Sequence, residues 1–168
     1  MKTSILILIT LLVGFSITSY SQATATTTAT ATIVTPISIT KTVDMNFGNV
    51  AVQAATGGTV ILDPAGSRTS TGGVTLPATT GTVSAASFTI NGNSSYTYSI
   101  TLPSSAVTLT NGAATMTATT FTSTPSATGT LTAGTQTLTV GATLNVGAAQ
   151  TAGVYVSGTP FNVTVNYN

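Results

Sequence analysis

Large apolar residues and small polar residues alternate along most of the chain with a period of two. Between Tyr96 and Leu102, every second residue is large and apolar or aromatic, and the residues between them are threonine or serine. Successive side chains of a strand point to opposite faces of a sheet, so this alternation predicts a half-buried strand. The segments 138–146 and 161–167 repeat the pattern. No segment places apolar residues at helical spacing, and the pattern therefore predicts an all-β chain.

A further alternating segment runs from Ile37 to Phe47, but Lys41 interrupts its apolar face. Lysine is seldom fully buried unless it is paired. We therefore expect a bulge, a strand break or an edge position at Lys41, each of which would leave its ammonium group in water.

Turn-forming residues separate the alternating segments. Asn91-Gly92 is the strongest of these signals, because both residues tolerate positive φ, and it predicts a turn between 88–90 and the strand at 96–102. Gly57-Gly58 and Gly72-Gly73 are also predicted to be turns, since they lack the strand and helix context of a phosphate-binding loop. The turn spacing favours an antiparallel β-sandwich of about seven to nine strands, with a closed barrel as the alternative.

The parity of the large residues also predicts the core. Each predicted core residue lies on the large-residue face of its own segment, and the set is Phe47, Phe88, Ile100, Leu144 and Val163.

The N-terminal residues are typical of a secretory signal peptide. Lys2 precedes an apolar run from Ile5 to Phe15, and the small residues Ser19 and Ser21 follow it. That run is shorter than the roughly 18 to 20 residues that span a bilayer as a helix, which disfavours the alternative of an uncleaved anchor. We expect residues 1–21 to be removed, leaving a chain without a transmembrane segment. Because no cysteine follows the run, attachment as a lipoprotein is excluded.

Residues 22–34 are expected to form an extended Thr/Ala-rich tether before a single β-sandwich domain at 35–168. This tether holds nothing that could fill a core, so a flexible linker is one interpretation. Ala29, Ala31 and Ile33 nevertheless share one parity, and the tether could therefore pair as a strand wherever a sheet edge is offered. The chain has no cysteine, so stability must come from core burial and sheet pairing alone.

Charged residues make up 3% of the chain, against about a quarter in an average protein. Beyond residue 21 they are Lys41, Asp44, Asp63 and Arg68. Nucleic-acid binding requires clustered lysine and arginine, which this chain cannot supply. Weak charge repulsion favours self-association, or a solubilising group such as a glycan.

The composition also argues against catalysis. The chain has no histidine and no cysteine, which removes the commonest general base and metal ligand and the thiol nucleophile. The remaining candidates are a carboxylate pair of Asp44 with Asp63, a serine activated by Lys41, and a calcium ion at Asp63, whose position before a proline is more typical of a turn. The patterns at Asn93 and Asn162 match glycosylation acceptors, but neither is taken as a site. We assign no catalytic, cofactor-binding or metal-binding residue and expect no cofactor.

The order of the segments resembles a family of secreted bacterial proteins known as domain of unknown function 4402. The resemblance implies an immunoglobulin-like antiparallel β-sandwich without known enzymatic activity, and it is more distantly similar to spore coat protein U and pilin-like subunits. Its carriers are Met45-Asn46-Phe47-Gly48, the segments 58–64, 88–92, 96–103 and 140–144, Gly153-Val154-Tyr155, and 161–167.

Together these observations predict a secreted, non-enzymatic structural or surface-assembly subunit located outside the cytoplasm, at the cell surface, in the extracellular space or in the periplasm. Its expected partners are other copies of itself or other cell-surface proteins. The alternative is a monomeric adhesion or glycan-binding module that presents its loops to a ligand.

Overall fold

The computed structural model describes residues 21–168. The predicted signal peptide, apart from its last residue, lies outside the described residues. Residues 21–37 contain no strand, and almost all of their side chains are exposed. The chain divides into two units at Ile33 and Val34, close to the predicted end of the tether, and the strands all belong to the second unit.

Within the described residues the secondary structure is entirely β, as the alternating pattern predicted, and nine of the fifteen strands have four residues or more. The described part of the chain contains no helix of the length and apolarity needed to cross a membrane. The strands are β1 (Ser38–Val43), β2 (Asn46–Phe47), β3 (Ala51–Val52), β4 (Gly58–Leu62), β5 (Arg68–Gly72), β6 (Val74–Thr75), β7 (Val83–Ser84), β8 (Ala86–Asn91), β9 (Thr97–Thr101), β10 (Val107–Asn111), β11 (Ala114–Thr124), β12 (Thr128–Thr130), β13 (Thr135–Val146), β14 (Val156–Ser157) and β15 (Thr164–Tyr167).

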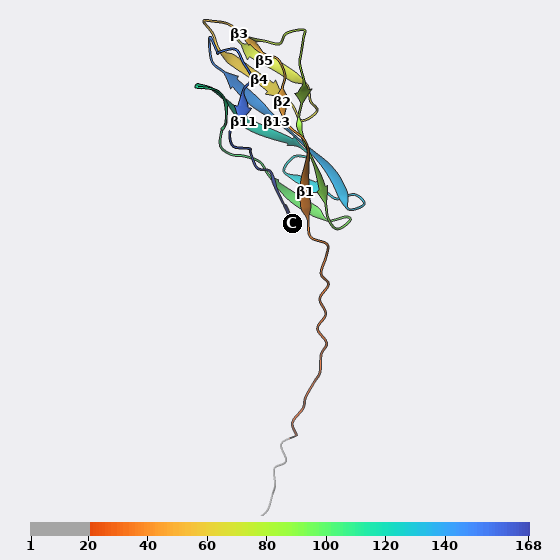
Figure 1. Ribbon diagram of the computed structural model, residues 1–168. Coiled ribbons are helices and arrows are strands. Elements are labelled where there is room, and N and C mark those ends of the chain that lie inside the picture. Colours follow the sequence, from red (N-terminus) through yellow and green to blue (C-terminus); the bar gives the residue numbers. More distant parts are fainter. Residues whose placement is uncertain (1–20) are drawn as a thin grey trace, which may run out of the picture. The chain divides into compact units, whose positions relative to one another are not determined.

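The long strand β13 organises the domain (Figure 1). One edge of β13 pairs with β11. The other edge pairs first with β8, through residues 135–140, and then with β4, through residues 142–146. All these pairs are antiparallel, and they join eight strands into one sheet with β10 and β14 beyond β11. On this edge, β13 therefore changes its neighbouring strand from β8 to β4 about halfway along its length.

Two apolar clusters, one behind each half of β13, form the core. The first, here called the Leu138 core, lies between the eight-stranded sheet and a second sheet of β12, β9 and β15. The second, called the Leu144 core, is covered by the short pairs β2–β7 and β3–β6. The buried residues of the Leu138 core are Ala86, Ile90, Tyr98, Leu131, Leu138, Val140 and Val165, and those of the Leu144 core are Phe47, Val60, Leu62, Val74, Ala118, Ala142, Leu144 and Val146. The fold is thus a two-layered, sandwich-like arrangement of antiparallel sheets.

Lys41 behaves as its position in the sequence predicted. Strand β1 lies at an edge of the eight-stranded sheet, and its register with β8 shifts between Lys41 and Val43. The shift leaves Lys41 exposed, with its Nζ 2.6 Å from Oδ1 of Asp44. The edge position and the irregular register together keep the ammonium group out of the core.

The chain turns at residues 93–95, between β8 and β9 and next to the turn predicted at Asn91-Gly92, but the two strands it joins do not pair with each other. Strand β8 pairs with β1 and β13, whereas β9 pairs with β12 and β15, so the chain crosses from one layer to the other at this point. A Cβ atom at Gly92 would lie 2.2 Å from the hydroxyl oxygen of Tyr167. Gly92 is therefore needed for a close approach rather than for a hairpin.

The turn predicted at Gly72-Gly73 is present, because Gly72 has φ 65° and Gly73 forms the turn between β5 and β6. The turn predicted at Gly57-Gly58 is absent, because Gly58 begins β4 and faces Gly72 across the β4–β5 pair. A Cβ at Gly58 would lie 2.0 Å from the carbonyl oxygen of Thr71, so these glycines allow two strands to approach closely. The turn between β4 and β5 is made instead by residues 63–67, with Gly66 at φ 87°.

Of the five residues predicted to be buried, Phe47 and Leu144 are buried, and the other three are half-buried and pack against the Leu138 core. The parity was thus correct for all five. In the last segment, Phe161, Val163, Val165 and Tyr167 alternate with exposed residues as predicted.

We expect Ile100→Ala to lower the free energy of unfolding by about 2 kcal/mol, the low end for an aliphatic core residue, because Ile100 is only half-buried. Thr101→Ala, at the neighbouring exposed position, should cost less than about 0.5 kcal/mol. Urea denaturation measures both. A larger loss for Thr101 than for Ile100 would contradict the assigned register.

Candidate functional site

The domain contains a wide, mostly apolar groove of about 1160 Å³. One margin is the segment 43–52, which contains β2 and β3, and the other is the segment 150–157 together with Pro160 and Phe161. Leu109, Met116 and Val146 lie between the margins on three successive strands of the eight-stranded sheet, β10, β11 and β13. The groove therefore exposes part of one sheet face that the second layer leaves open.

Among residues 21–168, hydrogen bonds join the two margins near one end only. A hydrogen bond of 3.1 Å from the amide of Ala149 to the carbonyl of Gln53 connects them there. Beyond it, β2 and β3 pair with β7 and β6, and β14 pairs with β10 alone. Within residues 21–168, the backbone amide and carbonyl groups of Val50 and Val154 form no hydrogen bond to another protein group. Both margins thus offer unpaired backbone, as the edge of a sheet does.

The groove is bordered by exposed apolar side chains and by little charge. Val154 is 80% exposed, Val156 61% and Val43 42%. The ionic side chains that line it are Lys41 and Asp44, which pair with one another. An apolar surface of this kind usually marks a site of interaction.

Arg68 holds the 43–52 margin in place. From β5, its guanidinium Nη1 donates hydrogen bonds to the carbonyl oxygens of Phe47 and Asn49, the latter at 2.8 Å, and its Nη2 reaches that of Thr80 at 3.3 Å. Arg68 is half-buried, and no carboxylate among the described residues pairs with it. The guanidinium group therefore links β2, the loop that follows β2 and the loop that precedes β7.

We expect Arg68→Met to lower the free energy of unfolding by about 1.5–3 kcal/mol, because it removes charge-assisted hydrogen bonds to three backbone carbonyls. Lys41→Met removes an exposed ion pair and should cost less than about 1 kcal/mol. Thermal denaturation of both variants gives the comparison. Equal losses would show that Arg68 acts only as a surface charge.

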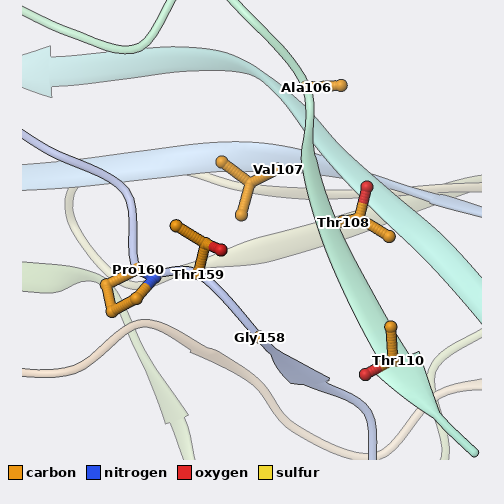
Figure 2. Close-up of a pocket in the computed structure, with 7 residues that line it drawn as sticks. All are labelled: Ala106, Val107, Thr108, Thr110, Gly158, Thr159 and Pro160. Atoms are coloured by element: carbon orange, nitrogen blue, oxygen red, sulfur yellow. The ribbon is translucent and has the colours of Figure 1, made fainter.

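A smaller hollow of about 360 Å³ lies at the outer edge of β10. Figure 2 shows Val107 projecting towards the segment of Thr159 and Pro160, while Ala106 and Thr108 project the other way. Strand β14 pairs with β10 only at Leu109 and Thr110, so the chain separates from β10 beyond Ser157. The hollow thus results from the early end of β14.

The two candidate carboxylates, Asp44 and Asp63, interact with different neighbouring groups and not with each other. The carboxylate of Asp44 pairs with Lys41, whereas Oδ1 of Asp63 accepts the amide of Ser67 at 2.9 Å in the β4–β5 turn. The described residues contain no group of three acidic, histidine or cysteine side chains suited to a metal ion. Asp63 therefore acts as a turn former in this structure.

The two glycosylation patterns differ in their surroundings. Asn162 is exposed. Asn93 is half-buried, and its backbone N–H donates a hydrogen bond to the hydroxyl oxygen of Tyr167 at 2.6 Å. That hydroxyl in turn donates to the carbonyl of Thr35 at 2.8 Å, which fastens the start of the domain to its last strand.

Sequence reasoning missed the groove. Its margins alternate as ordinary strands do, with Val50 and Val52 on one parity, so the pattern gives no sign that the second layer leaves the sheet open there. The only signal was the scarcity of strand-like alternation between 147 and 160, where turn residues and exposed valines occur together.

Comparison with known proteins gives one match. No curated protein and no solved structure matches the chain significantly. A family model described as a domain of unknown function (DUF4402) matches residues 37–167, which covers nearly all of the β domain and confirms the family resemblance seen in the sequence. The similarity to spore coat protein U has no counterpart among these matches. The chain belongs to the DUF4402 family.

Proposed function

We propose that this protein is a non-enzymatic subunit of an exported surface or extracellular assembly, which associates with copies of itself. The observation that carries the proposal is the open apolar groove, since monomeric proteins seldom leave a sheet face and exposed valines uncovered together. The N-terminal segment at 1–21, with the features of an export signal, supports the location.

The charge distribution supports association. Residues 22–168 contain two cations and two anions, and one cation and one anion neutralise each other beside the groove. Copies of the domain therefore meet with little electrostatic repulsion. An architecture similar to pilin-like subunits would suit such an assembly.

The side chains also favour a non-enzymatic role. The chain contains no histidine, cysteine or glutamate, and both aspartates are engaged by neighbouring groups. General acid–base chemistry would need a side chain poised in a cleft, and the described groove is lined mostly by apolar residues, with Lys41 and Asp44 paired to each other.

Analytical ultracentrifugation of the secreted protein over a wide concentration range tests the proposal. We expect a concentration-dependent rise in mass that persists in 0.5 M salt, because apolar association is not screened. Electron microscopy of the same samples would show the form of the assembly. A monomer at every concentration would overturn the proposal and favour the monomeric adhesion or glycan-binding module.

A further inference from the structure

We infer that the groove receives the Thr/Ala-rich segment 23–33 of a second copy of this chain, bound as an added β-strand. This inference rests on the proposed function and specifies the contact through which copies associate. Three observations support it. The margins of the groove have free backbone groups, the segment has apolar residues on one parity, and the charge and length of the segment suit the groove.

Backbone pairing is the first property. A strand added to a sheet edge gains affinity mainly from main-chain hydrogen bonds, which require unpaired amide and carbonyl groups on the receiving side. Val50 on one margin and Val154 on the other provide such groups. The C-terminal strand β15 pairs with β9 beside the Leu138 core, so it completes that half of the domain and leaves the Leu144 half open.

Side-chain pattern is the second property. In the segment 23–33 the odd positions are alanine or isoleucine except at residue 27, and the even positions are threonine. An added strand would thus direct its apolar parity to the groove and its threonines to solvent. Ile33 is 95% exposed, which leaves a large apolar side chain without cover.

Charge and length agree with this arrangement. The segment carries no ionic group, and the groove's two ionic side chains already form a pair. Eleven extended residues span about 36 Å. The 43–52 margin has ten residues and is not extended throughout, because Gly48 has φ 68°. The segment is therefore long enough to follow the whole margin.

A charge-placement experiment tests the inference in the full secreted chain. We expect Ala29→Asp/Ala31→Asp to weaken self-association at least tenfold, since it places carboxylates against an apolar surface. The matched control, Thr28→Asp/Thr30→Asp, adds the same charge on the solvent parity and should change association less than twofold. Equal weakening by both variants would overturn the parity assigned to the bound strand.

Cysteine cross-linking tests the location directly, because the natural chain has no cysteine. An Ala31→Cys protein is mixed with a Val154→Cys protein carrying a tag of different mass. A heterodimeric disulfide is expected, whereas Thr69→Cys, on an exposed position of β5 outside the groove, should give none. Association that persists without the Val154 cross-link would overturn the inference and leave the proposed function standing. Failure of the unaltered chain to associate would overturn both.

Discussion

Replacement of Gly141 by alanine is expected to destabilise the domain by about 3 kcal/mol, the upper end for an added methyl group in a packed core. Gly141 is buried in β13 at the point where that strand exchanges β8 for β4 as its partner. A Cβ there would lie 2.1 Å from the carbonyl oxygen of Leu62 and 2.7 Å from the carbonyl carbon of Asp63. Both neighbouring atoms belong to the backbone, so no side-chain rotation can relieve the clash.

Gly158 provides the matched control for this prediction. A Cβ at Gly158 would meet no atom within 4 Å, and its φ lies outside the left-handed region. Gly158→Ala should therefore change the free energy of unfolding by less than about 0.5 kcal/mol in guanidinium denaturation. If Gly141→Ala proved as mild as Gly158→Ala, β13 and β4 would have to be less closely packed than the structure shows.

The position of Gly141 explains how one strand supports two cores. Residues 135–140 of β13 carry the Leu138 core, and residues 142–146 carry the Leu144 core. On the other edge, the β11 register shifts between Thr119 and Thr122, opposite this exchange point. The sheet is thus irregular on both sides of Gly141, and the absence of a side chain allows three strands to meet there.

The local features of the fold were predictable from the sequence because they depend on neighbouring residues. The alternation in 161–167 reports the pleat of a single strand, and the structure places each of those residues on the predicted face. The position of Lys41 on an apolar face predicted an irregularity, and the structure has one. Such features need no knowledge of the strand's partner.

The pairing of distant strands was not predictable in the same way. Asn91-Gly92 has the composition of a hairpin turn, yet β8 and β9 lie in different layers. What decides the conformation there is Tyr167, which approaches Gly92 from the other end of the chain. Tyr96 likewise lies on the predicted buried parity but is 41% exposed and packs edge-to-face against Tyr167 at 5.5 Å. A two-residue period predicts which face of a strand a residue lies on, but not how deeply the second layer buries that residue.

The groove illustrates the same limit at the candidate site. Leu109 and Met116 face each other across β10 and β11 and would be equally apolar under a complete second layer. Their partial exposure depends on where the segment 150–161 runs, and that segment has only two residues in a strand. The parity of the tether, by contrast, was visible in the sequence. The inferred contact therefore joins a strand that the sequence predicts to a groove that only the structure reveals.

Loss of the Tyr98 side chain is expected to have the largest effect of the substitutions considered. Tyr98 is fully buried in β9, and its hydroxyl crosses from the three-stranded layer to donate a hydrogen bond of 2.8 Å to Oε1 of Gln136 in β13. The same oxygen accepts the amide of Thr130 in β12 at 2.9 Å. Tyr98→Ala should therefore cost about 3–5 kcal/mol, a large share of the roughly 5–15 kcal/mol that stabilises a typical domain.

Tyr98→Phe separates the ring from the hydroxyl and also predicts a change with pH. It should cost about 1 kcal/mol near neutral pH, since Gln136 keeps its hydrogen bond from Thr130.

Burial raises the pKa of Tyr98 above its ordinary value of 10.0. Below pH 10 the hydroxyl keeps its proton in both states, and its contribution to stability is constant. Above pH 10 the unfolded chain releases that proton while the folded chain retains it, so the free energy of unfolding falls as the pH rises. Urea denaturation at pH 8 and at pH 10.5 should show the difference between the natural protein and Tyr98→Phe shrinking at the higher pH. A difference that grew with pH would mean that the fold favours the phenolate, contrary to the buried position of Tyr98.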